Sequence, residues 1–324
     1  MSRILVTARS LQAHRDADYI EFVQTAGHEV VFADVSDSYL DEAGLRVQLT
    51  GIAGVMASSE PYTDAIFDEF PELRVVARLG VGYDAVDLEA AAEHGVPVMI
   101  AAGSNDTTVA ESAVGLMLTL ARDLRGHFQR TAAGDWTRPS MTELRDKTIG
   151  IIGLGRIGRS LVERLAGFQV RFVVTEPFPD PAFVTLHDIE LTEADNVFRE
   201  ADFLTLHAPL GAETRAVVDA RRLGLMKPNA YVINTARGGL VDEDALFDAL
   251  QAGRIAGAAL DVRTEEPPRD PRLAQLPNVL LTPHMAGVSR ESLVRMSNVS
   301  AKNVVDVFNG SWDRNMVVNG VFSE

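Results

Sequence analysis

Short runs of apolar and β-branched residues recur along the chain, and the segments between them carry apolar residues at the three- and four-residue spacing of helices. Successive runs in the first part begin roughly 20 to 27 residues apart, which suits strand–helix–strand units in a parallel sheet. The strands predicted there are Arg3–Thr7, Val30–Ala33, Ile52–Met56, Val75–Arg78 and Pro97–Ile100.

A second series of such runs begins after residue 147. Its predicted strands are Thr148–Ile152, Arg171–Thr175, Phe203–Leu206, Tyr231–Asn234, Gly257–Asp261 and Val279–Thr282. Two series of alternating strands and helices predict an α/β protein with two doubly wound parallel-sheet domains. A length of 324 residues is enough for two domains with an interdomain cleft.

Two further helical segments flank the second series. From Val109 to Leu124 the apolar residues fall on one helical face, which predicts a buried face or a subunit contact. The polar stretch Arg125–Arg145, which contains Trp136, is interpreted as an exposed connection or an oligomerisation arm. Ser289–Phe308 is predicted to form one more helix.

Composition and charge limit the class of protein. Hydrophobic residues make up 46% of the chain, which is typical of a globular protein. No apolar stretch approaches the ~18 residues of a membrane span, and the N-terminus lacks the pattern of a signal peptide, so a cytoplasmic location is expected. The net charge of −16 opposes binding to nucleic acid or anionic membranes. Neither class of partner is expected.

The residue types present also restrict the chemistry. The chain has no cysteine, which excludes disulfides, thiolate catalysis and sulfur-ligated metal. Its seven histidines show no metal-binding spacing, so no metal is predicted.

A glycine pattern follows the first strand of the second series and opens a helical segment, Ile157–Ala166. The residues of this motif are Gly153, Leu154, Gly155, Arg156, Ile157 and Gly158. In this context the first glycine permits a tight turn, the second lets the backbone approach a pyrophosphate, and the third allows close helix–strand packing. Alone the pattern is equally typical of an ordinary turn.

Glu176 strengthens the dinucleotide interpretation, since it ends the next predicted strand, where a carboxylate accepts hydrogen bonds from the adenosine ribose. The same carboxylate repels a 2′-phosphate, and the residues after it include no arginine. NAD is therefore favoured over NADP as the cofactor.

Three candidate catalytic residues follow successive strands of the second series: Arg237, Glu266 and His284. Hydride reduction of a 2-oxo acid needs a cation, an acid and a group that keeps the acid charged. Each residue alone is better explained as an ordinary loop side chain, but together they suit a ligand crevice at the carboxyl ends of parallel strands. His207 also follows a strand and is interpreted as structural.

An ordered set of motifs resembles the D-isomer-specific 2-hydroxyacid dehydrogenase family, which includes phosphoglycerate, glycerate, hydroxypyruvate and glyoxylate enzymes. These motifs are Arg78–Asp87, Val109–Glu111, the glycine pattern, His207–Leu210, Asn234–Gly239, Glu266-Pro267 and Pro283-His284. The resemblance implies a flavodoxin-like substrate domain of residues 1–100 and 289–324 and a Rossmann NAD-binding domain of residues 101–288.

The resemblance also implies roles for individual residues. Arg237 would orient the substrate, His284 would be the acid/base, and Glu266 would hold the imidazole. Further NAD contacts are implied at Pro209, Thr235, Ala236, Asp261 and Gly287, and substrate contacts at Val81, Gly82 and Asn105. Gly82 and Asn105 are equally compatible with structural roles. The region 109–145 would form a homodimer contact.

Departures from the family pattern bear on the substrate. The loop Ala57–Tyr62 lacks the arginine that binds phosphate in phosphoglycerate enzymes and carries Glu60 instead, which favours a non-phosphorylated 2-hydroxy or 2-oxo acid. The chain resembles the short form of the family, without a regulatory domain. Two alternatives stay open: D-3-phosphoglycerate dehydrogenase activity, and an NAD-sensing, corepressor-like interaction protein. Formate dehydrogenase is disfavoured because Glu266 stands where that enzyme has Gln.

Overall fold

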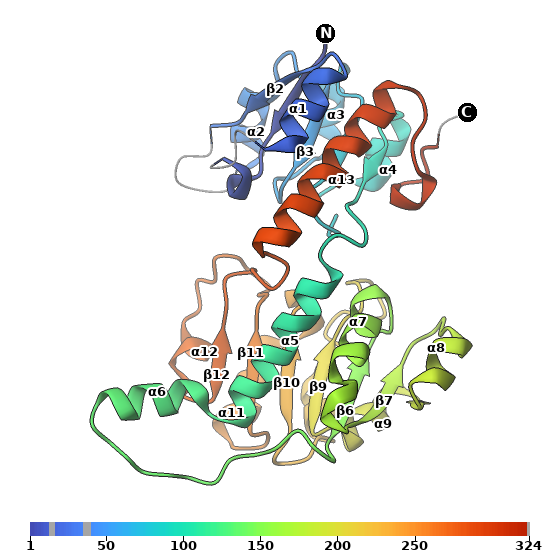
Figure 1. Cartoon of the computed structure of the whole chain (residues 1–324). Coiled ribbons are helices and arrows are strands. Elements are labelled where there is room, and N and C mark those ends of the chain that lie inside the picture. The colour runs from blue at the N-terminus through green and yellow to red at the C-terminus, as the bar shows by residue number, and fades with distance from the viewer. Residues whose placement is uncertain (13–16, 35–39, 323–324) are drawn as a thin grey trace. The chain divides into compact units, whose positions relative to one another are not determined.

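The computed structural model describes residues 1–12, 17–34 and 40–322, and the chain divides into two compact units (Figure 1). Unit 1 comprises Met1–Asn105 and Val288–Glu324, and unit 2 comprises Asp106–Gly287. The boundary that the sequence suggests after residue 100 therefore falls a few residues early.

Unit 1 is built on a five-stranded parallel sheet in the order β2-β1-β3-β4-β5. The strands are β1 Arg3–Val6, β2 Glu29–Phe32, β3 Gly54–Ala57, β4 Val76–Arg78 and β5 Val98–Met99. All five were predicted from the apolar runs, with ends displaced by one or two residues.

Helices cover both faces of this sheet, and each face has its own apolar core. They are α1 Asp18–Thr25, α2 Glu42–Leu49, α3 Asp64–Glu69, α4 Leu88–Glu93 and α13 Arg290–Phe308, with the short helices η1 Arg9–Leu11 and η4 Arg314–Met316. Helix α13 comes from the far end of the chain and packs against α1, β3 and β4 (Figure 1). Ser289 caps it in a reciprocal hydrogen-bonded capping box with Ser292, so the predicted helix begins where its cap predicts.

Unit 2 is built on a seven-stranded parallel sheet in the order β12-β11-β10-β9-β6-β7-β8. The strands are β6 Thr148–Ile152, β7 Arg171–Thr175, β8 Ile189–Leu191, β9 Phe203–Leu206, β10 Tyr231–Asn234, β11 Gly257–Leu260 and β12 Val279–Leu281. The sequence analysis missed β8. This short edge strand buries only Ile189, so it has no continuous apolar run to detect.

Two helices of unit 2 precede its first strand, and the others lie between or after the strands. These helices are α5 Asp106–Ala121, α6 Leu124–Ala132, α7 Arg156–Leu165, α8 Pro181–Leu186, α9 Ala194–Glu200, α10 Ala220–Leu223, α11 Glu243–Gln251 and α12 Arg272–Gln275, with the short helices η2 Ala166–Phe168 and η3 Gly238–Leu240. Helix α5 packs against α7, β10 and β11.

The stretch 125–145, interpreted from the sequence as an exposed connection or an oligomerisation arm, contains most of a helix, α6. Asp123 adopts a left-handed backbone conformation with φ 41°, which ends the run of α5, and its carboxylate accepts the N–H of Gly126 at the start of α6. None of the α6 side chains is buried. The predicted helix Val109–Leu124 thus corresponds to α5, which ends at Ala121, and a second helix, α6, lies on the surface of unit 2 within the polar stretch.

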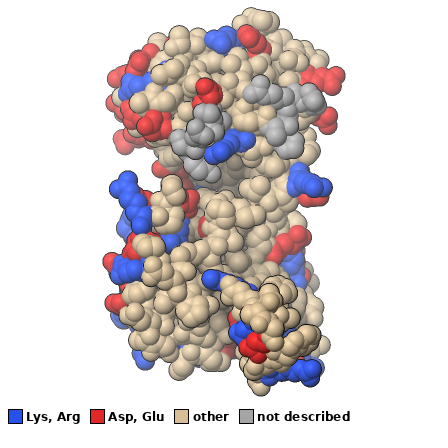
Figure 2. All heavy atoms as spheres, turned by 90° about the vertical axis from the view of Figure 1, so that its left-hand side faces the viewer, with Lys and Arg blue, Asp and Glu red and all other residues tan. Residues whose placement is uncertain are grey.

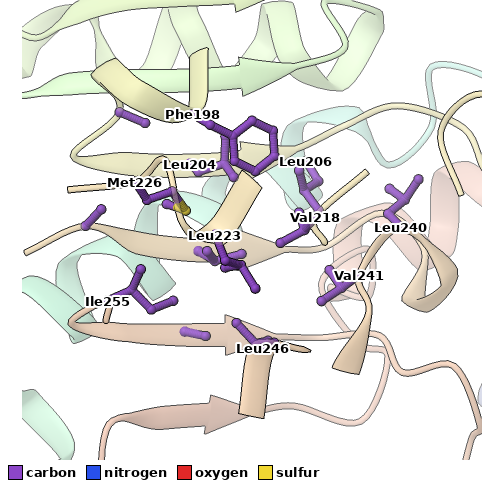
Figure 3. Close-up of a cluster of buried hydrophobic side chains, with 14 of the residues drawn as sticks. Phe198, Leu204, Leu206, Val218, Leu223, Met226, Leu240, Val241, Leu246 and Ile255 are labelled. Atoms are coloured by element: carbon purple, nitrogen blue, oxygen red, sulfur yellow. The ribbon is translucent and has the colours of Figure 1, made fainter. Parts of the chain in front are cut away.

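Figure 3 shows the core on one face of the unit 2 sheet, where side chains from strands and helices interdigitate. Its labelled members are Phe198, Leu204, Leu206, Val218, Leu223, Met226, Leu240, Val241, Leu246 and Ile255. This core fixes the sheet whose strand ends carry the candidate site residues.

The surface carries charges of both signs. On the face shown in Figure 2, Lys and Arg side chains lie interspersed with Asp and Glu. Among the described residues, none of the helices is long and apolar enough to cross a membrane.

Candidate active site

The strand order of unit 2 brings five segments to one edge of its sheet. β6, β9, β10, β11 and β12 are parallel neighbours, so their carboxyl ends face the same way. The residues that follow them include the glycine motif, His207, Arg237, Glu266 and His284. This edge is where open parallel sheets bind ligands.

The three motif glycines meet the requirements of a dinucleotide turn. Gly153 has φ 96°, and a Cβ there would lie 2.7 Å from the backbone nitrogen of Ala208. A Cβ on Gly158 would lie 2.4 Å from the carbonyl oxygen of Gly153. A Cβ on Gly155 would meet nothing within 4 Å. The first and third glycines are therefore needed for the turn, and the second faces open space above the helix.

The start of α7 is arranged to receive an anion. Its N-cap is Gly155, which offers no side chain to the first N–H groups, and Arg156 lies exposed in the first turn. Glu176, at the end of β7, accepts the N–H of Leu154 at 2.7 Å and the N–H of Phe178 at 3.0 Å. Its carboxylate is thereby held against the glycine turn. These residues fit the pyrophosphate and ribose of an NAD(P) dinucleotide.

Arg237 is presented by a turn that Asn234 shapes. The fully buried amide of Asn234 donates to the carbonyl of Arg237 at 2.8 Å and accepts the N–H of Ala236 at 3.0 Å. The hydroxyl of Thr235 in the same turn is buried and has no hydrogen-bond partner among the described residues. A buried donor of this kind suits a bound ligand. Pro209, after β9, is exposed at the same edge.

Asp261 organises the loop that carries His284. Its carboxylate, 2% exposed, accepts the hydroxyl of Thr282 at 2.5 Å and the N–H groups of Met285 and Ala286 at 2.9 and 2.8 Å. Gly287 follows directly at the end of unit 2. The resemblance implies a contact between Asp261 and the cofactor. It does not predict that Asp261 also holds the loop that carries His284.

His284 and Glu266 form a hydrogen-bonded pair. Nδ1 of His284 lies 2.7 Å from Oε2 of Glu266. This hydrogen bond raises the pKa of His284 above its ordinary value, and the negative charges of Glu266 and Asp261 act in the same direction. Burial and the charge of Arg237 oppose the rise. The pair therefore favours a protonated imidazole whose other nitrogen, Nε2, is available to a substrate.

The pKa of Glu266 is shifted the other way. Burial pushes it up, but the hydrogen bonds from His284 and from the backbone N–H of Arg263 bring it below its ordinary value. The charge of Arg237 contributes as well. The charge of Arg237 therefore lowers the pKa of both members of the pair.

His207 is the other histidine at this edge, and it differs in charge. Burial lowers the pKa of His207 to about 4, and its Nε2 lies 2.9 Å from the hydroxyl of Thr205. A neutral imidazole under the glycine turn is a poor acid at neutral pH, which supports the structural interpretation.

The sequence analysis did not predict an ion pair next to Glu266, in which Arg263 is buried and Glu243 is half-buried. The Nε and terminal nitrogen of Arg263 lie 3.1 and 2.7 Å from the two carboxylate oxygens of Glu243. The only sequence signal is a basic residue two positions after Asp261, within a strand-end loop. That signal does not indicate burial.

The substrate-binding candidates Val81, Gly82 and Asn105 belong to unit 1. The Nε of Arg78 donates to the carbonyl of Gly82 at 2.8 Å, which fixes the loop after β4. The side-chain oxygen of Asn105 is buried and has no hydrogen-bond partner among the described residues. Such an oxygen is available to a ligand.

One group of metal-ligating side chains occurs in the described part of unit 1. Asp64, Asp68 and His94 place one ligand atom each within 4.8 Å of one another, and all three are exposed. The histidine-spacing argument did not foresee this group. Exposed acidic clusters are common without an ion, and it lies outside the candidate site.

Comparisons with known proteins identify the second unit. Residues 114–286, more than half of the chain, match the family described as D-isomer specific 2-hydroxyacid dehydrogenase, NAD binding domain. A D-3-phosphoglycerate dehydrogenase of Methanocaldococcus jannaschii is 38% identical over 98% of this chain and 59% of its own length. The chain thus spans a little over half the length of this curated relative.

Two solved structures extend the likeness to the whole chain. An NADPH-dependent glyoxylate/hydroxypyruvate reductase from Sinorhizobium meliloti is 31% identical, with a TM-score of 0.83 over 100% of both chains. An NAD-dependent formate dehydrogenase from Staphylococcus aureus, solved with NAD, is 28% identical, with a TM-score of 0.85 over 98% of this chain and 99% of its own.

Proposed function

Because this chain belongs to the D-isomer-specific 2-hydroxyacid dehydrogenase family, we propose that it moves a hydride between nicotinamide and carbon 2 of a small 2-hydroxy or 2-oxo acid. The observation that carries the proposal is the 2.7 Å pair of His284 and Glu266, with Arg237 close enough to act electrostatically on both. An acid, its supporting carboxylate and a cation are what this reaction needs from side chains.

In the reductive direction, His284 is protonated and gives a proton from Nε2 to the oxygen on carbon 2. Arg237 binds the substrate carboxylate and the same oxygen through its guanidinium. Glu266 holds Nδ1, which fixes the ring and stabilises the imidazolium. In the oxidative direction, neutral His284 accepts that proton. The bound nicotinamide would supply or accept the hydride.

The cofactor proposed is NAD. The glycine turn and the start of α7 would hold the pyrophosphate, and Glu176 would accept the ribose hydroxyls. The carboxylate of Glu176 disfavours a 2′-phosphate by charge. The nearby Arg159 is paired with Asp180 at 3.0 Å, so it does not offset that charge freely. Thr235, Ala236, Pro209, Asp261 and Gly287 are the remaining proposed contacts.

The substrate proposed is non-phosphorylated, with contacts from Val81, Gly82 and Asn105. Glu60 lies in the loop after β3 and is 2% exposed. It accepts hydrogen bonds from the hydroxyls of Thr7 and Tyr62 and from the N–H of Ser58. A buried carboxylate at this strand edge repels a phosphate rather than binding it. D-3-phosphoglycerate is the second candidate, because the curated relative at 38% identity carries that name.

A dimer through residues 109–145 is also proposed. Phe128 and Trp136 are 72% and 76% exposed in this region, which is unusual for large apolar side chains on a monomer surface. Sedimentation of the wild-type chain and of the Trp136→Ala variant tests this contact.

The function is tested with a panel of 2-oxo acids, including hydroxypyruvate, glyoxylate and phosphohydroxypyruvate, each with NADH and NADPH. We expect turnover of a non-phosphorylated acid with NADH. His284→Gln is the matched control, expected to abolish turnover while NAD still binds in calorimetry. NAD binding without turnover of any acid by the wild type would support the sensing alternative instead, and full activity of His284→Gln would refute the assignment of the acid.

A further inference from the structure

We propose that Glu243 and Arg263 act as positioning residues, which hold the loop after β11 so that Glu266 stays aligned with His284. The inference rests on the proposed function for its catalytic meaning. Its geometric part, that this ion pair sets the orientation of Glu266, stands on the contacts within unit 2 alone.

The contacts form a chain from Glu243 to His284. One carboxylate oxygen of Glu266 is hydrogen-bonded to Nδ1 of His284, and the other accepts a hydrogen bond from the backbone N–H of Arg263 at 2.9 Å. The orientation of the Glu266 carboxylate therefore depends on where the backbone of Arg263 lies.

Glu243 fixes that backbone from two sides. It forms the two-point pair with the Arg263 guanidinium, and one of its oxygens also accepts the N–H of Thr264 at 2.8 Å. The Arg263 side chain is only 7% exposed and that of Glu243 is 22% exposed, so the pair is partly shielded from solvent, and its two-point contact restricts its geometry. Glu243 itself lies in the first turn of α11, where the helix dipole favours a carboxylate.

The Glu243–Arg263 pair also lies next to the loop that carries Arg237. The backbones touch at Gly238, where a Cβ would lie 2.0 Å from the carbonyl carbon of Arg263. Gly238 follows Arg237 directly, and the helix that begins at Glu243 continues from this loop. The pair thus holds together the loops that carry the proposed cation and the proposed carboxylate.

The experiment measures the ionisation of His284 directly, by ¹⁵N-histidine NMR titration of the full chain, with the signals assigned by their loss in His284→Gln. The variants are Glu243→Gln and Arg263→Met. The charged groups that act on His284 in unit 2 are Glu266, Asp261 and Arg237, and none of them is altered. If Glu266 loses its alignment, the pKa of His284 falls in both variants, by about half a unit or more.

The two variants separate positioning from simple charge effects. Removing the anion at residue 243 lowers a neighbouring histidine pKa through space, whereas removing the cation at residue 263 raises it. Only a loss of positioning lowers the pKa of His284 in both Glu243→Gln and Arg263→Met. A raised pKa in Arg263→Met would overturn the proposal.

Asp195→Asn is the matched control. It breaks another ion pair of unit 2, between Asp195 on α9 and Arg221 and Arg222, outside the loops of the candidate site. We expect it to lower the melting temperature without moving the pKa of His284. If Glu243→Gln and Arg263→Met behave the same way, the pair is merely structural and the proposal is wrong. Arg263→Lys keeps the charge, and it replaces Arg263→Met in the titration if that variant does not fold; the expected result is a smaller fall.

Kinetics with the substrate found by the panel complete the test. We expect kcat to fall about tenfold in Glu243→Gln with little change in KM for NAD, because misalignment affects the proton transfer and not the glycine turn. An unchanged kcat would contradict the catalytic part. If the wild type turns over no acid, the proposed function fails, while the NMR titration still decides the positioning.

Discussion

The backbone N–H of His284 donates to the carbonyl oxygen of Asp261 at 2.8 Å, and His284 itself has a left-handed backbone with φ 51°. This conformation is costly for a residue with a side chain. The carboxylate of Asp261 holds the next two N–H groups, of Met285 and Ala286. One residue therefore fixes the loop on both sides of the imidazole, and the direction of the ring follows from that loop.

Asp261→Asn is predicted to release this loop. The amide replaces one acceptor oxygen with a donor, which faces a backbone N–H or the Thr282 hydroxyl in a buried position. The cost to the free energy of unfolding is about 1–3 kcal/mol. We also expect kcat to fall at least tenfold as His284 loses its orientation.

Thermal melts and steady-state kinetics measure the two effects of Asp261→Asn. Thr282→Val is the graded control, because it removes a single donor and leaves both N–H contacts in place. A variant with lowered melting temperature but wild-type kcat would show that the strained loop is not needed for the reaction.

The pH dependence of the reaction follows from the shifted pKa of His284. Since the pKa lies above its ordinary value of about 6.5, the imidazole stays protonated to higher pH. In the proposed mechanism reduction needs the protonated form, so kcat/KM for the 2-oxo acid is expected to fall as pH rises through this pKa. Oxidation needs the neutral form, so its kcat/KM falls as pH drops through the same value.

Glu266→Gln is predicted to shift the pH profile of kcat/KM to lower pH. The variant removes the carboxylate whose hydrogen bond is the largest cause of the raised pKa, so the midpoint shifts to lower pH in both reaction directions. Rate profiles from pH 5 to about 10 locate the midpoints. A shift to higher pH, or none, would mean that another group titrates.

The glycine turn predicts opposite behaviour for two alanine variants. Gly155→Ala adds a methyl where no atom lies within 4 Å, so the free protein keeps its melting temperature but loses NAD affinity through a clash with the pyrophosphate. Gly158→Ala places the methyl 2.4 Å from the Gly153 carbonyl, so the free protein itself is destabilised. Melting curves with and without NAD distinguish the two. Equal loss of stability in both variants would contradict the assignment of the second glycine to the cofactor.

Some elements of the fold can be predicted from the sequence and others cannot. Eleven of the strands produce apolar runs long enough to predict, whereas β8 buries only Ile189 and leaves no pattern. The break between α5 and α6 depends on the backbone of Asp123, whose left-handed conformation no periodicity reveals. Local patterns predict strands and helices well where several positions of one element are buried, because those positions repeat at the spacing of that element.

In the candidate site, too, the sequence predicts single residues but not the contacts between separate loops. Motif positions place Glu266 and His284 on loops after strands, but their 2.7 Å contact joins residues of two separate loops and follows from the fold. The Glu243–Arg263 pair is invisible to motif reasoning, because two charged residues twenty positions apart ordinarily lie in solvent. The pair forms because the fold brings Glu243, at the start of α11, against the loop after β11 that carries Arg263 and Thr264.

Glu176 is predicted to set the choice between NAD and NADP. Glu176 is held by the N–H groups of Leu154 and Phe178, so its charge stays where the ribose 2′ position is expected. Glu176→Ala removes the repulsion of a 2′-phosphate and the acceptor for the ribose hydroxyls together. We expect the ratio of kcat/KM for NADH over NADPH to fall by about tenfold or more, mainly through KM. Glu190→Ala, an exposed carboxylate on β8, is the control for a general loss of negative charge. If the ratio in Glu176→Ala stays at the wild-type value, another residue sets the preference between NAD and NADP.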